Sequence, residues 1–214
     1  MSLEDLLSEY KRGSRQGLAE EKRRVLEEHV RQLQLSGIAS TVLKVGSKAP
    51  NFALLDHRGD EWELAAALAC GPVVLKFYRG TWCPYCNIEL RAYQLKLTEI
   101  RQRGAAFVAI SPEKPDFSQA FIAKEQIEFP VLTDSMNVVA QQFGLVFVVD
   151  EALQQLMREF GNSLPEKNGD FSWTLPLPGT FVISSGGRIE YSFAEPDFTI
   201  RADPGEVLAV LDNL

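Results

Sequence analysis

"VVLKFYRGTWCPYCNIELRAYQ", residues 73–94, places two of the three cysteines of the chain close together, with two residues between them. The first six residues are apolar except for Lys76 and include β-branched side chains, which is typical of a strand buried on both faces. The residues after the second cysteine mix apolar and polar side chains as expected of a helix. Cys83 and Cys86 therefore stand where a buried strand passes into a helix. Such a pair serves as a metal clip, a structural staple or a redox dithiol.

The composition limits the compartment and the partners. The 214-residue chain is 45% hydrophobic and contains 13 phenylalanines, which is enough for one well-buried core. Its formal net charge of −7 argues against nucleic acid or an anionic membrane as a partner, since both bind basic faces. No apolar run approaches the roughly 20 residues of a membrane span, and "MSLEDLLSEYKRGSR" has no apolar signal core. We therefore expect a cytoplasmic protein, in which a CxxC pair is more often catalytic or metal-binding than structural.

Short apolar runs alternate with helix-like stretches along most of the chain. Residues 51–64 predict a β-hairpin with a turn at Gly59, whereas the polar residues 162–173 predict a loop. This alternation indicates an α/β fold with a mixed sheet flanked by helices. We expect strands at 72–78, 105–111, 180–184 and 188–193 and a short strand or loop at 129–134. We expect helices from the cysteines to Gly104, within 111–126 and at 137–144, 151–161 and 204–214.

Residues 1–40 form a charged, helix-prone segment, called the N-terminal arm below, and residues 41–214 form the α/β domain. The glycines between positions 13 and 17 predict a break into two helices, and Ser36 with Gly37 supplies a stop. The arm is expected to lie on its own domain, with a subunit interface as the alternative. Four apolar residues recur at helical spacing and make one narrow stripe: Ala19, Leu26, Val30 and Leu33.

The sequence does not favour a metal site or a structural disulfide. A structural zinc site needs four cysteine or histidine ligands, but beyond the CxxC the chain offers only Cys70, His29 and His57 on separate predicted elements. A permanent Cys83–Cys86 disulfide would close a very short loop and stabilise the fold little. Cys70 is expected to be a small buried apolar residue. We predict no metal and no cofactor.

A redox dithiol fits this position best. Unpaired N–H groups and the positive end of the helix dipole stabilise a thiolate at the start of a helix, so Cys83 should be the acidic and more accessible sulfur. Pro84 suits the first helical turn, where its missing N–H leaves no hydrogen bond unmade. Cys86, one turn later, is expected to be buried and to close the disulfide. The helix should cover at least residues 86–100.

Five stretches, taken in order, resemble the AhpC/TSA (redoxin) family, in particular the peroxiredoxin-like branch of the thioredoxin-fold superfamily that carries a W-C-P-x-C motif. They are "VGSKAPNFALLDHRGDEWEL", "VVLKFYRGTWCPYCNIELRAYQ", "VAISPE", "FPVLTD" and "GTFVISSGGRIEY". The resemblance covers residues 45–213 and leaves the arm outside. It implies a thioredoxin-like fold with the hairpin added before the core. It also implies a thiol electron donor (a thioredoxin or glutathione system) and a disulfide or peroxide substrate, and leaves a homodimer open.

The chain departs from the peroxide-binding pattern of that family. In the family register, Cys86 falls on the peroxidatic cysteine, Cys83 on a hydroxyl-bearing residue and Arg79 on a proline. Pro178 stands where a later arginine is expected. A proline at this place resembles the thioredoxin-type loop that packs against a CxxC, so the bond between Leu177 and Pro178 is predicted to be cis and to lie beside Cys83.

The resemblance also suggests residues that position the substrate. Arg79, four residues before Cys83, is a candidate for a cation that replaces the missing arginine of the family, and Arg201, in "FTIRADP", is a weaker one. For both arginines, a solvent-exposed charge is the simpler interpretation. The buried carboxylate that thioredoxins carry on the strand before the motif is absent, since Lys76 or Phe77 occupies that stretch. The positioning candidates are Trp82, Pro84, Pro178 and Arg79.

These features predict a thiol–disulfide oxidoreductase that cycles Cys83 and Cys86 between dithiol and disulfide and reduces a protein or low-molecular-weight disulfide. The first alternative is a thiol-dependent peroxidase that reduces hydrogen peroxide or alkyl hydroperoxides, with Cys86 as the peroxidatic cysteine. The second alternative is a non-catalytic redox-sensing module whose oxidation changes a partner-binding surface. Turnover with an added reductant separates both enzymes from the module.

Overall fold

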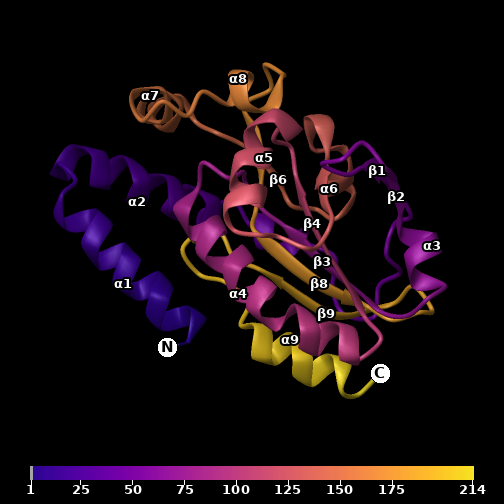
Figure 1. Cartoon of the computed structure of the whole chain (residues 1–214). Helices are drawn as coiled ribbons and strands as arrows, with labels where there is room; N and C mark the ends of the chain where they lie inside the picture. The colour runs from indigo at the N-terminus through magenta and orange to yellow at the C-terminus, as the bar shows by residue number, and fades with distance from the viewer. Residues whose placement is uncertain (1) are drawn as a thin grey trace.

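The computed structural model describes residues 2–214, which fold around a five-stranded sheet (Figure 1). From edge to edge the strands are β5 (Val131–Thr133), β4 (Ala106–Ser111), β3 (Val73–Phe77), β8 (Gly179–Ile183) and β9 (Ile189–Ala194). The first three strands run parallel, whereas β8 is antiparallel to β3 and β9 is antiparallel to β8. The sheet is therefore mixed, as predicted.

The central position of strand β3 explains why the sequence before the cysteines is almost entirely apolar. Its side chains alternate between the two faces of the sheet. Val73, Leu75 and Phe77 pack into one apolar cluster and Val74 into the other. Helices cover both faces, so both sets are buried. Lys76 is the exception, because it is a charged residue buried in the middle of this strand.

The two faces carry different helices. Figure 1 shows α4 and α9 lying along one face of the sheet, and their apolar residues share a cluster with the start of α1. The helices of this cluster are α1 (Leu3–Gln16), α4 (Pro84–Gln102), α5 (Pro115–Lys124) and α9 (Pro204–Leu211). The helices of the opposite cluster are α2 (Glu20–Leu35), α3 (Leu64–Leu68), α6 (Val138–Gln142), α7 (Glu151–Glu159) and α8 (Leu164–Asn168).

The N-terminal arm consists of α1 and α2 and packs against its own domain. The break between the two helices falls at Gly17, at the end of the predicted stretch, and α1 continues through Gly13. Leu3 and Leu7 enter the cluster of α4, whereas Leu33 enters the opposite cluster. The arm therefore spans from one face of the sheet to the other along the edge where the cysteines lie.

The predicted hairpin is present as β1 (Ala53–Leu55) and β2 (Glu61–Glu63), which pair antiparallel around Gly59. The prediction for residues 162–173 was incomplete, because this stretch contains α8 as well as a loop. It is followed directly by β7 (Thr174–Pro176), which pairs antiparallel with β6 (Val146–Val148), a pair that was not predicted. The helix was missed because most residues of this stretch are polar, although Leu164 at the start of α8 is buried in the core.

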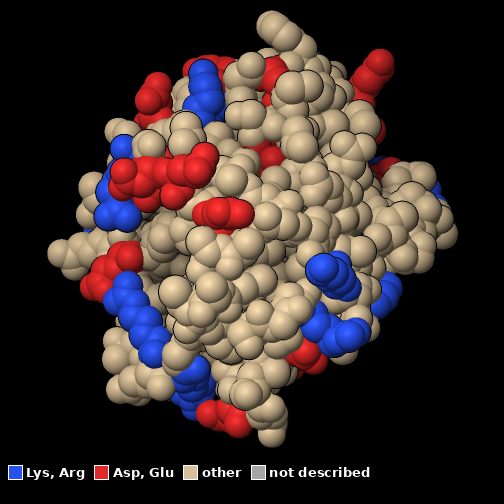
Figure 2. Space-filling model, turned by 90° about the vertical axis from the view of Figure 1, so that its right-hand side faces the viewer, with Lys and Arg blue, Asp and Glu red and all other residues tan. Residues whose placement is uncertain are grey.

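Two short 3-10 helices, η1 (Ile38–Ser40) and η2 (Ser135–Asn137), complete the elements of the described chain. Within residues 2–214, no helix combines the length and the apolar character that a bilayer crossing requires. Figure 2 shows the side of the molecule that carries α3 and the β1–β2 hairpin. Its acidic and basic side chains are interspersed around an uncharged centre, and the basic groups visible there do not merge into one broad patch.

Candidate active site

Cys83 is the N-cap residue of α4, and Pro84 is the first residue of the helix. The strand-to-helix junction and the helix over residues 86–100 are confirmed. Both cysteines are free thiols in the structure. The sulfur of Cys83 therefore lies at the positive end of a long helix, which favours its ionised form.

The predicted exposure of Cys83 was wrong. Cys83 is 1% exposed and Cys86 is 0% exposed, because the arm and the aromatic residues of the loop cover the pair. A difference between the two sulfurs nevertheless exists, since Cys83 lines a cavity of about 350 Å³ and Cys86 lies outside its lining. The arm side chains Tyr10, Leu18 and Leu26 form part of the wall of this cavity.

Arg79 contacts the sulfur of Cys83. Its Nη2 donates to Cys83 Sγ at 3.1 Å. The guanidinium group lies between two aromatic rings, with its carbon 4.1 Å from the ring centre of Phe198 and 5.1 Å from that of Trp82. Interpreting Arg79 as a solvent-exposed charge was wrong, because this loop folds inward and stacks the side chain in the core. Trp82, Pro84 and Arg79 all line the cavity beside Cys83.

A second guanidinium group contacts the other sulfur. Arg201 follows β9 and is buried, so interpreting it as an exposed charge was also wrong. Its Nη2 donates to Cys86 Sγ at 3.5 Å, and its Nε donates to Glu89 at 2.7 Å. Nothing in the local sequence could link Arg201 to Cys86, because the fold alone brings the C-terminal segment against the start of α4.

A buried ion network lies beneath the cysteine pair. Lys76 of β3 and Glu89 of α4 are both fully buried, and the Lys76 Nζ lies 2.6 Å from the Glu89 carboxylate. Lys76 also donates to the hydroxyl of Thr180, its neighbour across the sheet, at 3.0 Å. Burial lowers the pKa of Lys76, and the charge of Glu89 opposes that shift. Two cations, Lys76 and Arg201, thus share the Glu89 carboxylate.

The sequence analysis missed Glu89, although two signals were available. Lys76 interrupts an otherwise apolar strand, and a lysine buried at such a position needs an anionic partner. Glu89 lies one turn after Cys86, on the same inward face of α4 as the buried Tyr93. The carboxylate is therefore supplied by the helix, and it is absent from the strand as predicted.

The surroundings separate the acidities of the two thiols. Burial alone would raise the pKa of Cys83, but the hydrogen bond from the Cys86 thiol and the charges of Arg79 and Arg201 hold that pKa well below its usual range. Burial and the neighbouring Cys83 raise the pKa of Cys86 well above its usual range. These surroundings favour the thiolate on Cys83 over Cys86.

Glu113 fixes the loop that carries the motif. Its buried carboxylate accepts hydrogen bonds from the backbone N–H of Thr81 at 2.8 Å and from the Thr81 hydroxyl at 2.7 Å. The side chain of Asn87 donates to the Thr81 carbonyl at 2.8 Å. Burial raises the pKa of Glu113. The turn between β3 and α4 is thus anchored from a neighbouring loop and from the helix itself.

The predicted cis bond before Pro178 was wrong, since every peptide bond in residues 2–214 is trans. Pro178 is buried and comes just before Gly179, which pairs with Phe77 at the end of β3. The chain arrives here extended from β7, and the Leu177 N–H donates to the Leu145 carbonyl at 2.8 Å. Because the chain runs extended into β8, it makes no turn at Pro178 that would require a cis bond.

Cys70 stands apart from the other two cysteines and is exposed, so its prediction as a buried residue was wrong. α3 ends at Leu68, and Cys70 follows in the turn before β3, whereas the CxxC follows the other end of that strand. In the described part of the chain, no group of three or more histidine, cysteine or acidic side chains is arranged to hold a metal ion.

The mixed sheet, the helix-capping CxxC and the paired guanidinium groups define a thiol-dependent oxidoreductase of thioredoxin-like fold. The chain belongs to the AhpC/TSA family, whose model matches residues 45–192. The arm and Arg201 both lie outside the matched residues.

Several relatives and solved structures agree with this assignment. The chain is 26% identical over 184 residues to chloroplastic peroxiredoxin Q of Triticum aestivum, covering 86% of this chain and 74% of that one. It is 30% identical over 103 residues to peroxiredoxin Bcp of Escherichia coli, covering 48% of this chain and 65% of that one. The crystal structure of peroxidoxin BcpB from Mycobacterium tuberculosis superposes with a TM-score of 0.63 at 23% identity, over 80% of this chain and 98% of that one.

Proposed function

We propose that this chain is a thiol-dependent peroxidase in which the Cys83 thiolate attacks a hydroperoxide held in the adjacent cavity. One observation carries the proposal: Cys83 contacts the Arg79 guanidinium at 3.1 Å and also lines the cavity. The similarity to proteins named peroxiredoxins supports a peroxide as the oxidant. The alternative from the sequence analysis thus becomes the main proposal, with the roles of the two cysteines exchanged.

The site can support both steps of the chemistry. The Cys83 thiolate attacks one oxygen of the hydroperoxide, the O–O bond breaks, and Cys83 becomes a sulfenic acid while the alkoxide takes up a proton. Arg79 can stabilise the charge that develops on the departing oxygen. The sulfur of Cys86 then attacks the Cys83 sulfur, the S–O bond of the sulfenic acid breaks as the disulfide forms, and the proton of the Cys86 thiol joins the departing hydroxide as water. A thiol donor, which we expect to be thioredoxin or glutathione, returns two electrons.

The burial of the pair favours a small oxidant over a protein disulfide. With Cys83 1% exposed beneath the arm, a folded protein cannot bring its disulfide to the sulfur unless the arm moves. A hydroperoxide needs only the cavity of about 350 Å³. Exchange with a low-molecular-weight disulfide is the second candidate, supported by the position of the two cysteines one turn apart at the start of α4.

A side-by-side assay tests the proposal. Reduced protein is mixed with hydrogen peroxide, with tert-butyl hydroperoxide and with a folded protein disulfide, each with a thioredoxin or a glutathione supply. Turnover with a hydroperoxide that exceeds disulfide reduction is expected. Faster turnover of the disulfide than of the hydroperoxides would support the thiol–disulfide exchange function instead, and oxidation without turnover would indicate a sensing module.

The cytoplasmic location and a homodimer remain predictions.

A further inference from the structure

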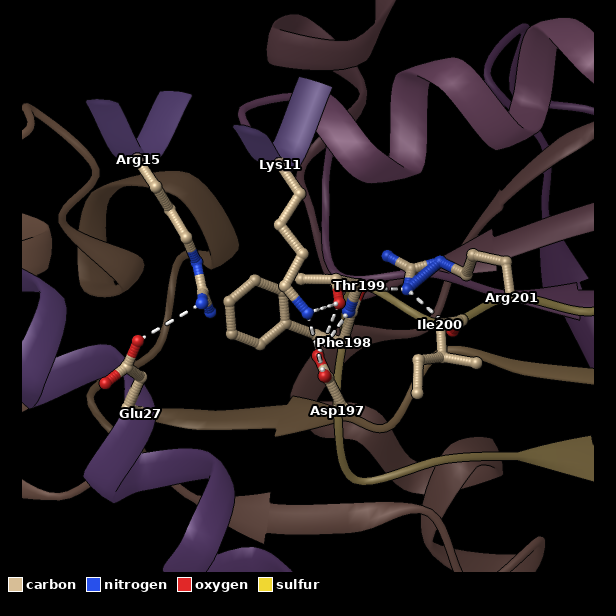
Figure 3. A network of polar contacts seen from close by, with 8 residues as sticks. All are labelled: Lys11, Arg15, Glu27, Asp197, Phe198, Thr199, Ile200 and Arg201. Atoms are coloured by element: carbon tan, nitrogen blue, oxygen red, sulfur yellow. Dashed lines mark hydrogen bonds and ion pairs between the residues drawn. The ribbon is translucent and has the colours of Figure 1, made fainter. Parts of the chain in front are cut away.

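Residues 197–201, which follow β9, link the arm to both cysteines. Figure 3 shows Lys11 reaching from α1 onto Asp197 and Thr199, with the ring of Phe198 beside it and Arg201 at the end of the same segment. We call these five residues the 197–201 segment. It is neither helix nor strand, so its side-chain contacts determine where it lies.

Lys11 holds the near end of this segment. Its Nζ donates to Asp197 Oδ2 at 3.2 Å and to the Thr199 hydroxyl at 2.8 Å. The other carboxylate oxygen of Asp197 accepts from the Thr199 N–H at 2.9 Å and from its hydroxyl at 2.7 Å. The side chains of Lys11 and Asp197 are 31% and 18% exposed, so this contact is partly shielded from water. One ammonium group therefore joins two members of a tight turn.

The far end of the segment reaches both sulfurs. The ring of Phe198 stacks on the Arg79 guanidinium, which donates to Cys83. The Arg201 guanidinium donates to the Phe198 carbonyl and to Cys86. The two guanidinium groups thus meet at Phe198, between the two residues that Lys11 holds.

We propose that Lys11 is a positioning residue, which holds the Arg79 and Arg201 guanidinium groups against the cysteine sulfurs through the 197–201 segment. The arm would then be part of the site, although it lies outside the residues matched by the family model. The catalytic consequence rests on the proposed function, whereas the effect on the cysteines does not. Loss of Lys11 should loosen Phe198 and Arg201 and leave Cys83 less acidic.

Of the other groups around Cys83, Cys86, Tyr85 and Glu113 belong to elements that Lys11 does not contact, so they should stay in place when Lys11 is replaced, whereas Tyr10 precedes Lys11 on α1. An ion pair that is partly open to solvent contributes little to global stability, so the variant should remain folded. The charged or titratable groups that interact with the Cys83 sulfur are Arg79, Arg201, Cys86, Tyr10, Tyr85 and Glu113.

The test measures the acidity of Cys83 directly. The full-length reduced protein is alkylated with iodoacetamide from pH 5 to pH 10, and peptide mass spectrometry follows Cys83, with the exposed Cys70 as internal reference. In Lys11→Met the Cys83 rate at acidic pH should fall about tenfold, as a rise of roughly one pKa unit produces, and should meet the wild-type rate at high pH. Lys11→Arg should restore most of the wild-type profile.

The matched control is Lys22→Met, which removes a different ion pair between the arm and the body, with Glu159 at 2.8 Å. Its Cys83 profile should match the wild type. An equal loss in Lys22→Met, a Lys11→Met profile identical to the wild type, or a loss that persists at high pH would each overturn the proposal. A further shift when Lys11→Met is added to Asp197→Asn with Thr199→Val would also overturn it.

Circular dichroism and thermal unfolding of each variant confirm that the fold is retained. If Lys11→Met shifts the alkylation profile while the wild type turns over no hydroperoxide, the positioning role stands and the proposed peroxidase function fails. If the wild type turns over hydroperoxide and Lys11→Met leaves the alkylation profile unchanged, the proposed peroxidase function stands and the positioning role of Lys11 fails.

Discussion

Each cysteine sulfur contacts a guanidinium group, but the two groups have different surroundings. In the described chain, Arg79 contacts a sulfur and aromatic rings, whereas Arg201 forms an ion pair with Glu89 at 2.7 Å. The charge of Arg79 is therefore directed mainly at Cys83, while that of Arg201 is partly neutralised before it reaches Cys86. The comparison teaches that a nearby cation activates a thiol according to what else that cation contacts, and not by distance alone.

The largest expected effect comes from removing the sulfurs one at a time. Cys83→Ser should lower hydroperoxide turnover by about three orders of magnitude or more, because it removes the thiolate that attacks. Cys86→Ser should still react once and accumulate a sulfenic acid on Cys83. Mass spectrometry after peroxide treatment distinguishes the products. Rapid sulfenic acid formation on Cys86 in Cys83→Ser would show that the family register, and not the geometry, assigns the roles.

The ion network beneath Cys86 provides the next effect, on stability. Glu89→Gln leaves two buried cations facing a neutral amide, so it should lower the free energy of unfolding by about 3–5 kcal/mol. Arg201→Met should cost less, because Lys76 stays paired with Glu89. Denaturant unfolding measures both. The control is Glu99→Gln, which breaks the exposed pair with Lys96 and should cost less than about 1 kcal/mol. Equal losses at positions 89 and 99 would contradict the network.

The two arginines should then separate the two chemical steps. Arg79→Met should lower the rate of the first step at neutral pH by about a hundredfold, because it removes a donor to the developing charge. Arg201→Met should slow the first step less, through the acidity of Cys83, and affect mainly the second step, so that sulfenic acid accumulates before the disulfide forms. Stopped-flow fluorescence of Trp82, which lies beside Arg79, can follow the steps. Arg91→Met, at an exposed pair on α4, is the control. Equal effects of both variants on the first step would remove the distinction.

The smallest expected effect is the pH dependence of the wild-type protein. Because the pKa of Cys83 is depressed, its thiolate persists well below the usual thiol value of about 8.5, and the rate should fall only as the pH drops through the lowered pKa. A depressed pKa also means that Cys83 contributes stability above its unfolded value and loses it as the pH falls through the folded one. Rates measured from pH 4 to pH 9 check this. A fall centred near pH 8.5 would contradict the assignment.

The sequence was sufficient for the parts of the site that depend on local pattern. β3 and α4 carry periodicities of their own, so the strand-to-helix junction, Cys83 at the start of the helix and Pro84 in its first turn lie as predicted. The contacts of Arg201 could not be predicted, because they depend on where a C-terminal segment without regular structure packs.

Two failures have a related cause. The exposure of Cys83 was mispredicted because the narrow apolar stripe of the arm gives no indication of which surface it covers. The cis bond at Pro178 was mispredicted because the strand pair β6–β7, from which the chain reaches Pro178 in an extended conformation, consists of strands of three residues, too short to recognise from sequence. In both cases a tertiary contact overrides a correct local observation.

The covered position of Cys83 also has a consequence for kinetics. If the disulfide is as covered as the thiols are, a protein reductant can engage it only in the fraction of molecules whose arm is open. The apparent rate constant with that reductant is then the intrinsic one multiplied by this fraction. Each 1.4 kcal/mol or so by which the docked arm is favoured slows the reductive half of the cycle tenfold and leaves the oxidative half unchanged. The arm would therefore determine the lifetime of the disulfide form in each catalytic cycle.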